Sequence, residues 1–255
     1  MKSLEVLFSP AEFSALERLD LSATVCVVFD VLRATSSMVA ALSNGAKAII
    51  PVTGIPEALT LRLRQAEVLL AGEREGVRIP AQLTGSISFD LGNSPREFTN
   101  EIVAGRTIVM TTTNGTRALR ACAHARRILV SSFLNLGATR DTLEQHAPVH
   151  LVLVCSGTHE EAAYEDALCA GALCDLLWSK ASAGHVSDSA LIARKLFRQE
   201  QHDLLAAVSE SRNGRRLLSL PELRDDVRYC VQRDVLSTVP EMNKHGQVLP
   251  GEASP

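Results

Sequence analysis

The chain of 255 residues is 46% hydrophobic and 22% charged, as is usual for a globular protein of one or two domains. Its formal net charge of -3 gives no electrostatic reason to expect a nucleic acid or an anionic membrane as a partner. No apolar run approaches the length of a membrane span, the first residues lack the pattern of a signal peptide, and the six cysteines form no C-x-x-C pair. We therefore expect a cytoplasmic protein that binds neither nucleic acid nor membrane, with formation of a homo-oligomer left open.

Short apolar runs alternate with longer helical patterns over the first two thirds of the chain. Strands are predicted at residues 24–29, 47–52, 68–72, 107–110, 128–130 and 149–154, and helices at residues 55–67 and 160–180. The strand runs do not alternate apolar and polar residues, which is typical of strands buried on both faces. This order of elements predicts an α/β fold with a mostly parallel sheet.

The last seventy or so residues have a different, helical pattern. One long helix is predicted at residues 188–208, capped by Ser187 or Asp188, and a second at residues 222–234. Asn213-Gly214 is interpreted as a break between them. No linker divides the chain, so we expect a single domain over residues 1–240, with two similar α/β subdomains left open, and a fraying polar tail at residues 241–255.

Three apolar strands each run into a small polar turn and then a helix. The segments are VCVVFD-VLRATSS, TIVM-TTTNGT and LVLV-CSGTHEE. In open α/β sheets, ligands bind outside the carboxyl ends of the strands, and the following helix N-termini favour anions. The turns therefore predict an anion site along one edge of the sheet.

Acidic residues stand beside these turns. Asp30 ends the first strand, three residues before Arg33, and is a metal ligand, a nucleophile or a helix cap. Glu161 and Glu165 are four residues apart and share a helix face, with Asp166 next to them. Acids beside an anion site suggest Mg²⁺, which takes one or two carboxylates, waters and phosphate oxygens. The alternative is an exposed acidic face at the start of a helix.

Single residues exclude two phosphatase classes. Haloacid-dehalogenase-type phosphatases need a second aspartate two residues after the first, where this chain has Leu32. A thiol-phosphatase loop needs arginine six residues after Cys155, where this chain has Glu161. Cys155 is therefore interpreted as a buried, inert thiol. The charged loop at residues 72–76 follows a strand and either presents its charges to a cleft or is a solvated turn.

Five motifs, in fixed order, carry a resemblance to a known family. FDVLRATSS, AGEREG, FDLGNSPREF, TTTNGTRAL and CSGTHEEAAYEDALCAGAL resemble the 2-phosphosulfolactate phosphatase family over about residues 6–240. The resemblance implies a three-layer α/β/α fold distinct from that of the haloacid dehalogenases. It also implies Mg²⁺-dependent hydrolysis of 2-phospho-3-sulfolactate to 3-sulfolactate and phosphate, a step on one route to coenzyme M. Another 2-phospho-hydroxy acid, such as phospholactate, stays open as the substrate.

The matching motifs also imply site residues for this small, strongly anionic substrate. The residues expected to be catalytic are Asp30, Arg33, Arg74 and Glu165. The metal is expected to be bound by Asp30 together with Glu165 or Asp166. The phosphate is expected at Arg33, Thr35, Ser36, Asn114, Gly115 and Thr116, with Ser156 and Gly157 completing the cradle. Arg74 and Arg117 are expected to bind the distal acid. Attack by a metal-activated water or by Asp30 stays open, and the competing class is a non-catalytic small-anion-binding protein.

Overall fold

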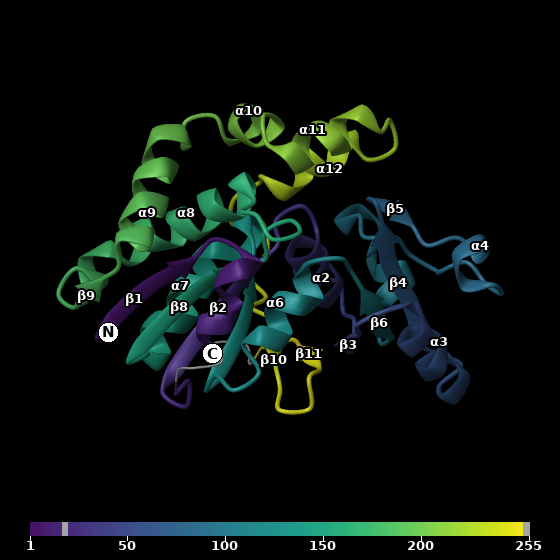
Figure 1. Ribbon diagram of the computed structural model, residues 1–255. Helices are drawn as coiled ribbons and strands as arrows, with labels where there is room; N and C mark the ends of the chain where they lie inside the picture. Colours follow the sequence, from purple (N-terminus) through teal and green to yellow (C-terminus); the bar gives the residue numbers. More distant parts are fainter. Residues whose placement is uncertain (17–19, 252–255) are drawn as a thin grey trace.

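The computed structural model describes residues 1–16 and 20–251 and contains one large mixed sheet (Figure 1). In the described residues the strand order is β5-β4-β6-β3-β11-β10-β7-β2-β8-β1-β9. The strands are β1 (Ser3–Leu7), β2 (Thr24–Phe29), β3 (Ala48–Pro51), β4 (Leu69–Arg74), β5 (Val77–Arg78), β6 (Thr107–Thr111), β7 (Arg127–Ser131), β8 (His150–Cys155), β9 (His185–Val186), β10 (Glu241–Met242) and β11 (Val248–Leu249).

Two parallel groups of strands make up most of this sheet. Strands β7, β2, β8, β1 and β9 pair in parallel, and so do β3, β6 and β4. The β10–β11 hairpin joins the groups by antiparallel pairing with β7 and β3. The predicted strands are confirmed, and β1 is an additional strand that the apolar runs did not reveal.

The hairpin corrects the expectation of a fraying polar tail from residue 241 onward. Met242 and Val248 are buried in an apolar core, and the turn between them closes through the Asn243 side chain, which accepts from His245 N at 2.9 Å and Gln247 N at 3.0 Å. A polar stretch with only two inward side chains carries too short a pattern to be recognised as a strand pair. Here it lies in the middle of the sheet.

Helices cover both faces of the sheet and give the expected three-layer α/β/α architecture. In β2, Val25, Val27 and Phe29 pack into one core and Cys26 and Val28 into the other. Helices α7 (Leu136–His146) and α8 (Tyr164–Ala181) belong to the first core, and α2 (Ala34–Ser43) and α6 (Gly115–Ala121) to the second. A third, smaller apolar cluster packs α3 (Ile55–Arg64) on β3, β4 and β6. Short helical segments are α1 (Phe13–Leu16), α4 (Ala81–Thr84), α5 (Asn100–Val103), η1 (Pro10–Glu12), η2 (Pro95–Glu97) and η3 (Phe133–Asn135).

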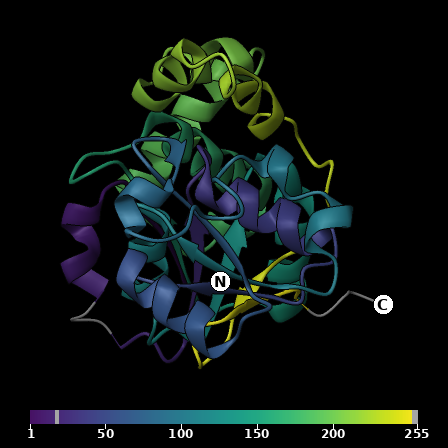
Figure 2. The ribbon, with the colours of Figure 1, turned by 90° about the vertical axis from the view of Figure 1, so that its right-hand side faces the viewer.

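Four helices follow β9 in the described residues, and they are α9 (Asp188–Glu200), α10 (Leu204–Ser209), α11 (Arg212–Ser219) and α12 (Arg224–Cys230). Helix α9 rises on the left beside α8, and α10, α11 and α12 lie across the top of the molecule (Figures 1 and 2). The single helix predicted at residues 188–208 is divided, because the Asp203 side chain caps α10 by accepting from Ala206 N.

The predicted break at Asn213-Gly214 is also wrong. Ser211 caps α11 by accepting from Gly214 N, so both residues lie in the first turn of a helix. A Cβ on Gly214 would lie 2.0 Å from the Val208 carbonyl oxygen, so this glycine allows a close approach of two helices. Among the described residues, no helix is long and apolar enough to cross a membrane.

Candidate active site

A cavity of about 1070 Å³ lies where the loops after β2, β4, β6 and β8 meet helix α11. In Figure 1, β4 and β5 stand on the right and α11 and α12 lie above. The loops do not line up along one edge of a parallel sheet, since β7, β10, β11 and β3 separate β2 from β6. Charged residues lining the cavity are Asp30, Arg33, Glu73, Arg74, Glu75, Arg78 and Arg216.

Asp30 lies at the end of β2, is 8% exposed and lines the cavity. Its Oδ1 accepts from Ala34 N at 3.1 Å, and its own backbone N donates to Thr35 Oγ1 at 2.9 Å. A Cβ on Gly115 would lie 2.8 Å from Asp30 Oδ2, so glycine is required for the β6 turn to approach the carboxylate. One oxygen of the Asp30 carboxylate thus accepts a hydrogen bond from the first turn of α2, and the other lies against the turn that follows β6.

Burial raises the pKa of Asp30 to about 7, and the negative charges of Glu73 and Glu165 add to this shift. The Ala34 N–H and the Arg33 guanidinium act in the opposite direction. Three carboxylates therefore share a poorly solvated region in which Arg33 supplies positive charge. Such a region favours binding of a further cation.

The raised pKa of Asp30 predicts a pH-dependent stability in the metal-free protein. Between the unfolded value of 3.8 and about 7 the folded protein holds a proton that the unfolded chain lacks, so stability falls as pH rises through this window. The loss amounts to about 4 kcal/mol at most. Urea unfolding with chelator at pH 4.5 and 7.5 should show a larger loss for the wild type than for Asp30→Asn. An equal pH dependence in both proteins would contradict the assignment.

The two acids at the start of α8 have different surroundings. Asp166 accepts from Val31 N at 2.8 Å and from Gly157 N at 3.1 Å, so it joins the loops after β2 and β8. Glu165 Oε1 accepts from Asn213 Nδ2 at 2.6 Å. Glu165 Oε2 is buried and has no hydrogen-bond partner in the described part of the chain.

Asp30 and Glu165 could bind Mg²⁺ only at a site where the protein supplies few of the ligands. The described residues contain no group of three or more His, Cys, Asp or Glu side chains that could hold a metal ion. Mg²⁺ does not need such a cage, because it commonly takes one or two carboxylates and completes its shell with waters and phosphate oxygens. The crowded Asp30 carboxylate and the unpartnered Glu165 oxygen suit this role, whereas both Asp166 oxygens already accept backbone N–H groups.

Two of the three predicted arginines line the cavity. Arg33 is 3% exposed, and its Nη1 donates to Asp226 Oδ2 at 2.7 Å. Arg74 donates from Nη1 to the Glu73 carbonyl oxygen at 2.6 Å and from Nη2 to Thr111 Oγ1 at 3.3 Å. Arg117 lines a separate hollow, where it is half exposed and pairs with Glu160 at 2.5 Å. The structure thus brings Arg33 and Arg74 together and leaves Arg117 outside.

The polar groups of the β2 turn are largely used within the turn itself. Thr35 and Ser36 are fully buried and do not line the cavity. Ser36 Oγ donates to the Val31 carbonyl oxygen at 2.9 Å, so its single proton is committed. These hydroxyls shape the loop that carries Asp30 and Arg33.

The β6 and β8 turns meet across the cavity. Asn114 lines it and accepts from His159 N at 3.4 Å, while the Thr116 hydroxyl donates to the Thr112 carbonyl oxygen at 3.2 Å. Ser156 Oγ is buried without a partner in the described residues. At Gly157, φ is +64° and a Cβ would lie 2.4 Å from the Glu161 carbonyl oxygen, so only glycine fits this turn.

Cys155 is buried at the end of β8, as the sequence predicted. It is fully buried, and burial raises the pKa of its thiol well above 9.0. The other five cysteines are also free and buried. A thiol held in its protonated form is a poor nucleophile, so a phosphocysteine step has no support here.

Several cavity residues escaped the sequence analysis. Glu73 accepts from Thr113 N at 3.1 Å and from Gly76 N at 2.8 Å, which fixes the β4 loop against the β6 turn. The charged loop at residues 72–76 contained the signal for Glu73. Asn213 and Arg216 come from α11, where a run of arginines gave no sign of a site.

Comparison with known proteins gives one consistent result. A family model described as 2-phosphosulpholactate phosphatase matches residues 13–245. A protein of Pseudothermotoga lettingae named probable 2-phosphosulfolactate phosphatase is 39% identical over 239 residues, covering 93% of this chain and 94% of the relative. Relatives of the same name from Symbiobacterium thermophilum and Synechocystis sp. are 37% and 36% identical, covering 90% and 88% of this chain and 95% and 89% of the relatives.

Proposed function

Because the chain belongs to the 2-phosphosulpholactate phosphatase family, we propose that it hydrolyses 2-phospho-3-sulfolactate to 3-sulfolactate and phosphate with the help of Mg²⁺. The observation that supports this proposal best is that arginines line the same cavity as the buried Asp30, whose carboxylate is close to those of Glu73 and Glu165. A cavity that bound only anions would gain nothing from the buried carboxylates of Asp30 and Glu73 in its wall, which repel an anion unless a cation lies between them. This disfavours a non-catalytic anion-binding protein.

Asp30 and the unpartnered oxygen of Glu165 are the groups that we assign to Mg²⁺. The ion would supply charge neutralisation at the phosphate, which is the main demand of phosphoryl transfer. Arg33 and the β6 turn at Asn114 and Gly115 are assigned to the phosphate oxygens, and Arg74 to the distal sulfonate or carboxylate. In the net reaction the oxygen of water forms a new bond to phosphorus as the bond between phosphorus and the ester oxygen breaks, and a proton from the water leaves with the ester oxygen as the alcohol.

Phosphate release from three esters tests the proposal. The purified protein with Mg²⁺ should hydrolyse 2-phospho-3-sulfolactate with a higher kcat/KM than 2-phospholactate, and both far better than phenyl phosphate, which lacks the distal acids. A preference for 2-phospholactate would keep the reaction class and change the substrate to another 2-phospho-hydroxy acid. Absence of phosphate release from all three esters would refute the proposal.

We attribute this selectivity for substrates with a distal acid to Arg74. Arg74→Ala should raise KM for 2-phospho-3-sulfolactate by about tenfold or more, because an ion pair with a distal acid contributes binding without chemistry. KM for phenyl phosphate should change little. The same substitution at Arg117 tests the other arginine assigned from the sequence. A selective loss in Arg117→Ala but not in Arg74→Ala would transfer the distal-acid role to Arg117.

The cellular setting is part of the proposal. Six free, buried thiols support a reducing compartment, and we assign the protein to the cytoplasm. With 3-sulfolactate as its product, the reaction would serve a route to coenzyme M. The expected partner is the small anionic substrate, and formation of a homo-oligomer stays open.

A further inference from the structure

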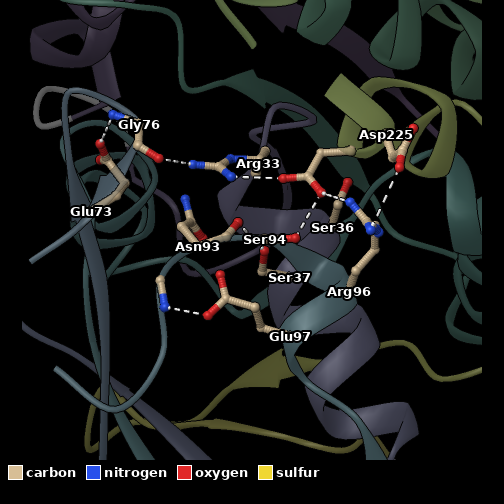
Figure 3. Close-up of polar contacts among 12 residues, drawn as sticks. Arg33, Ser36, Ser37, Glu73, Gly76, Asn93, Ser94, Arg96, Glu97 and Asp225 are labelled. Atoms are coloured by element: carbon tan, nitrogen blue, oxygen red, sulfur yellow. Dashed lines mark hydrogen bonds and ion pairs between the residues drawn. The ribbon is translucent and has the colours of Figure 1, made fainter. Parts of the chain in front are cut away.

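Arg33 is held from two sides by parts of the chain that are distant in sequence (Figure 3). Its Nη2 donates to the Gly76 carbonyl oxygen at 2.5 Å, and its Nη1 donates to Asp226 Oδ2 at 2.7 Å. Gly76 follows β4, and Asp226 lies in α12. Arg33 itself lines the cavity, so the two contacts determine how the guanidinium faces a ligand there.

The Gly76 side of this arrangement is rigid. Glu73 Oε2 accepts from Gly76 N at 2.8 Å, and Glu73 Oε1 accepts from Thr113 N at 3.1 Å. Gly76 has φ of +83°, which favours glycine and fixes the turn that presents its carbonyl group. One nitrogen of the Arg33 guanidinium therefore donates to a carbonyl group whose position is fixed by the contacts of Glu73.

The Asp226 side is a fully buried carboxylate with its own set of donors. Asp226 Oδ1 accepts from Ser94 Oγ at 2.7 Å and from Arg96 Nη1 at 3.4 Å, and Oδ2 accepts from Arg33. The side chains of Arg33 and Asp226 are 3% and 0% exposed, so water does not compete for this pair. The Asp226 carboxylate therefore has Arg33 on one oxygen and Ser94 and Arg96 on the other, and Figure 3 labels these three donors.

The geometry points to Asp226 as a positioning residue for Arg33, and we propose that it orients the guanidinium toward the phosphate of the substrate. An arginine has five N–H donors. Two are used by Gly76 and Asp226, which leaves the others for a ligand in the cavity. This inference rests on the proposed function in one respect: it takes the ligand at Arg33 to be a phosphate group.

A purely structural alternative must be separated from this role. Asp226 also connects α12 to the loop at Ser94, and a buried ion pair is by itself weak evidence for stability. A structural role predicts a change in folding stability without a selective change in phosphate binding. A positioning role predicts an effect that depends on the presence of Arg33.

The test compares Asp226→Asn with Asp225→Asn. Asp225 precedes Asp226 in α12, is 68% exposed and pairs with Arg96 at 3.7 Å, so it is a matched control that does not touch Arg33. The readouts are the melting temperature, kcat and KM for the 2-phospho acids, and the Kd for inorganic phosphate from calorimetry. We expect Asp226→Asn to lower kcat/KM and raise the phosphate Kd by about tenfold to a hundredfold, and Asp225→Asn to stay within about twofold of the wild type.

A double-mutant cycle makes the test specific. In an Arg33→Lys background, Asp226→Asn should cost little more kcat/KM, because residues that act through one group are not additive. If Asp226→Asn does not fold, Ser94→Ala replaces it, since this variant removes only the hydroxyl that orients the carboxylate. It should shift kcat/KM and the phosphate Kd in the same direction by a smaller factor.

The outcomes also separate this inference from the proposed function. A folded Asp226→Asn protein with wild-type phosphate Kd and kcat/KM would overturn the inference, and so would a full additive loss in the Arg33→Lys background. Phosphate binding that depends on Asp226, without hydrolysis of any ester, would refute the proposed function and support the inference. A wild-type protein that neither binds phosphate nor hydrolyses an ester would overturn both.

Discussion

Replacing Asp30 by asparagine is expected to lower kcat by about a hundredfold to a thousandfold, the range observed when one preorganised electrostatic contact to a reacting group is removed. Asn keeps the shape of the side chain and can still accept from Ala34 N. The change therefore removes one negative charge from the acid cluster formed by Asp30, Glu73 and Glu165, while Ala34 N in the first turn of α2 keeps its hydrogen-bond acceptor. Steady-state phosphate release at saturating substrate measures the effect.

Mg²⁺ titration separates the two catalytic roles that remain for Asp30. Weakened Mg²⁺ binding in Asp30→Asn supports a metal ligand, and unchanged binding with lost turnover supports a nucleophile. Asp141→Asn is the control, because Asp141 is 55% exposed and pairs with its neighbour Arg140 outside the cavity. A folded Asp30→Asn protein with near-normal turnover would leave Asp30 with only its contact to the start of α2.

The elements that the sequence predicted well are those with a long or strongly apolar pattern. All six residues of β2 are buried, which matches a β-branched run without alternation. Helix α8 has apolar residues along most of its length and begins within four residues of the predicted start. The β10–β11 hairpin was missed because its two-residue strands are held by pairing with β7 and β3, which no local pattern reports.

The candidate site divides in the same way. Asp30, Glu165 and Arg74 stand in recognisable motifs, and the structure places Asp30 and Arg74 on the cavity and Glu165 next to Asn213. Arg117 also stands in a motif, yet it lies two residues after Gly115 in a helix. A helix turns by about 100° per residue, so two residues turn the side chain away from the position that faces Asp30.

Asp226, Asn213 and Arg216 show what a motif search cannot find. They come from α11 and α12 and reach the site because these helices contact the β2 loop, the β4 loop and the start of α8. Asp226 is 193 residues from Arg33 in the chain. In the sequence, its charge stands among arginines and acids that look like an ordinary solvated helix face.

Removal of divalent cations is expected to abolish hydrolysis, with a loss of about a thousandfold or more, because a metal ion supplies several kcal/mol of charge stabilisation in the transition state. The reason lies in the acid cluster. Without a cation, Asp30, Glu73 and Glu165 would repel a phosphate at the cavity, although the Arg33 guanidinium offsets part of their negative charge. Phosphate release after chelation and dialysis, with metal content measured, tests this, and Mg²⁺ should restore the rate.

Glu165→Gln tests whether the Glu165 side chain is one of the groups that bind the required Mg²⁺. The variant keeps an amide oxygen beside Asn213 but removes the charge from the unpartnered Oε2 position, so it should raise the Mg²⁺ concentration for half-maximal activity by about tenfold or more. Glu161→Gln is the matched control, because Glu161 is 74% exposed and pairs with Arg212 at 2.6 Å. Equal shifts in the two variants would assign the effect to general surface charge, and full activity in a protein shown to be free of metal would remove Mg²⁺ from the proposal.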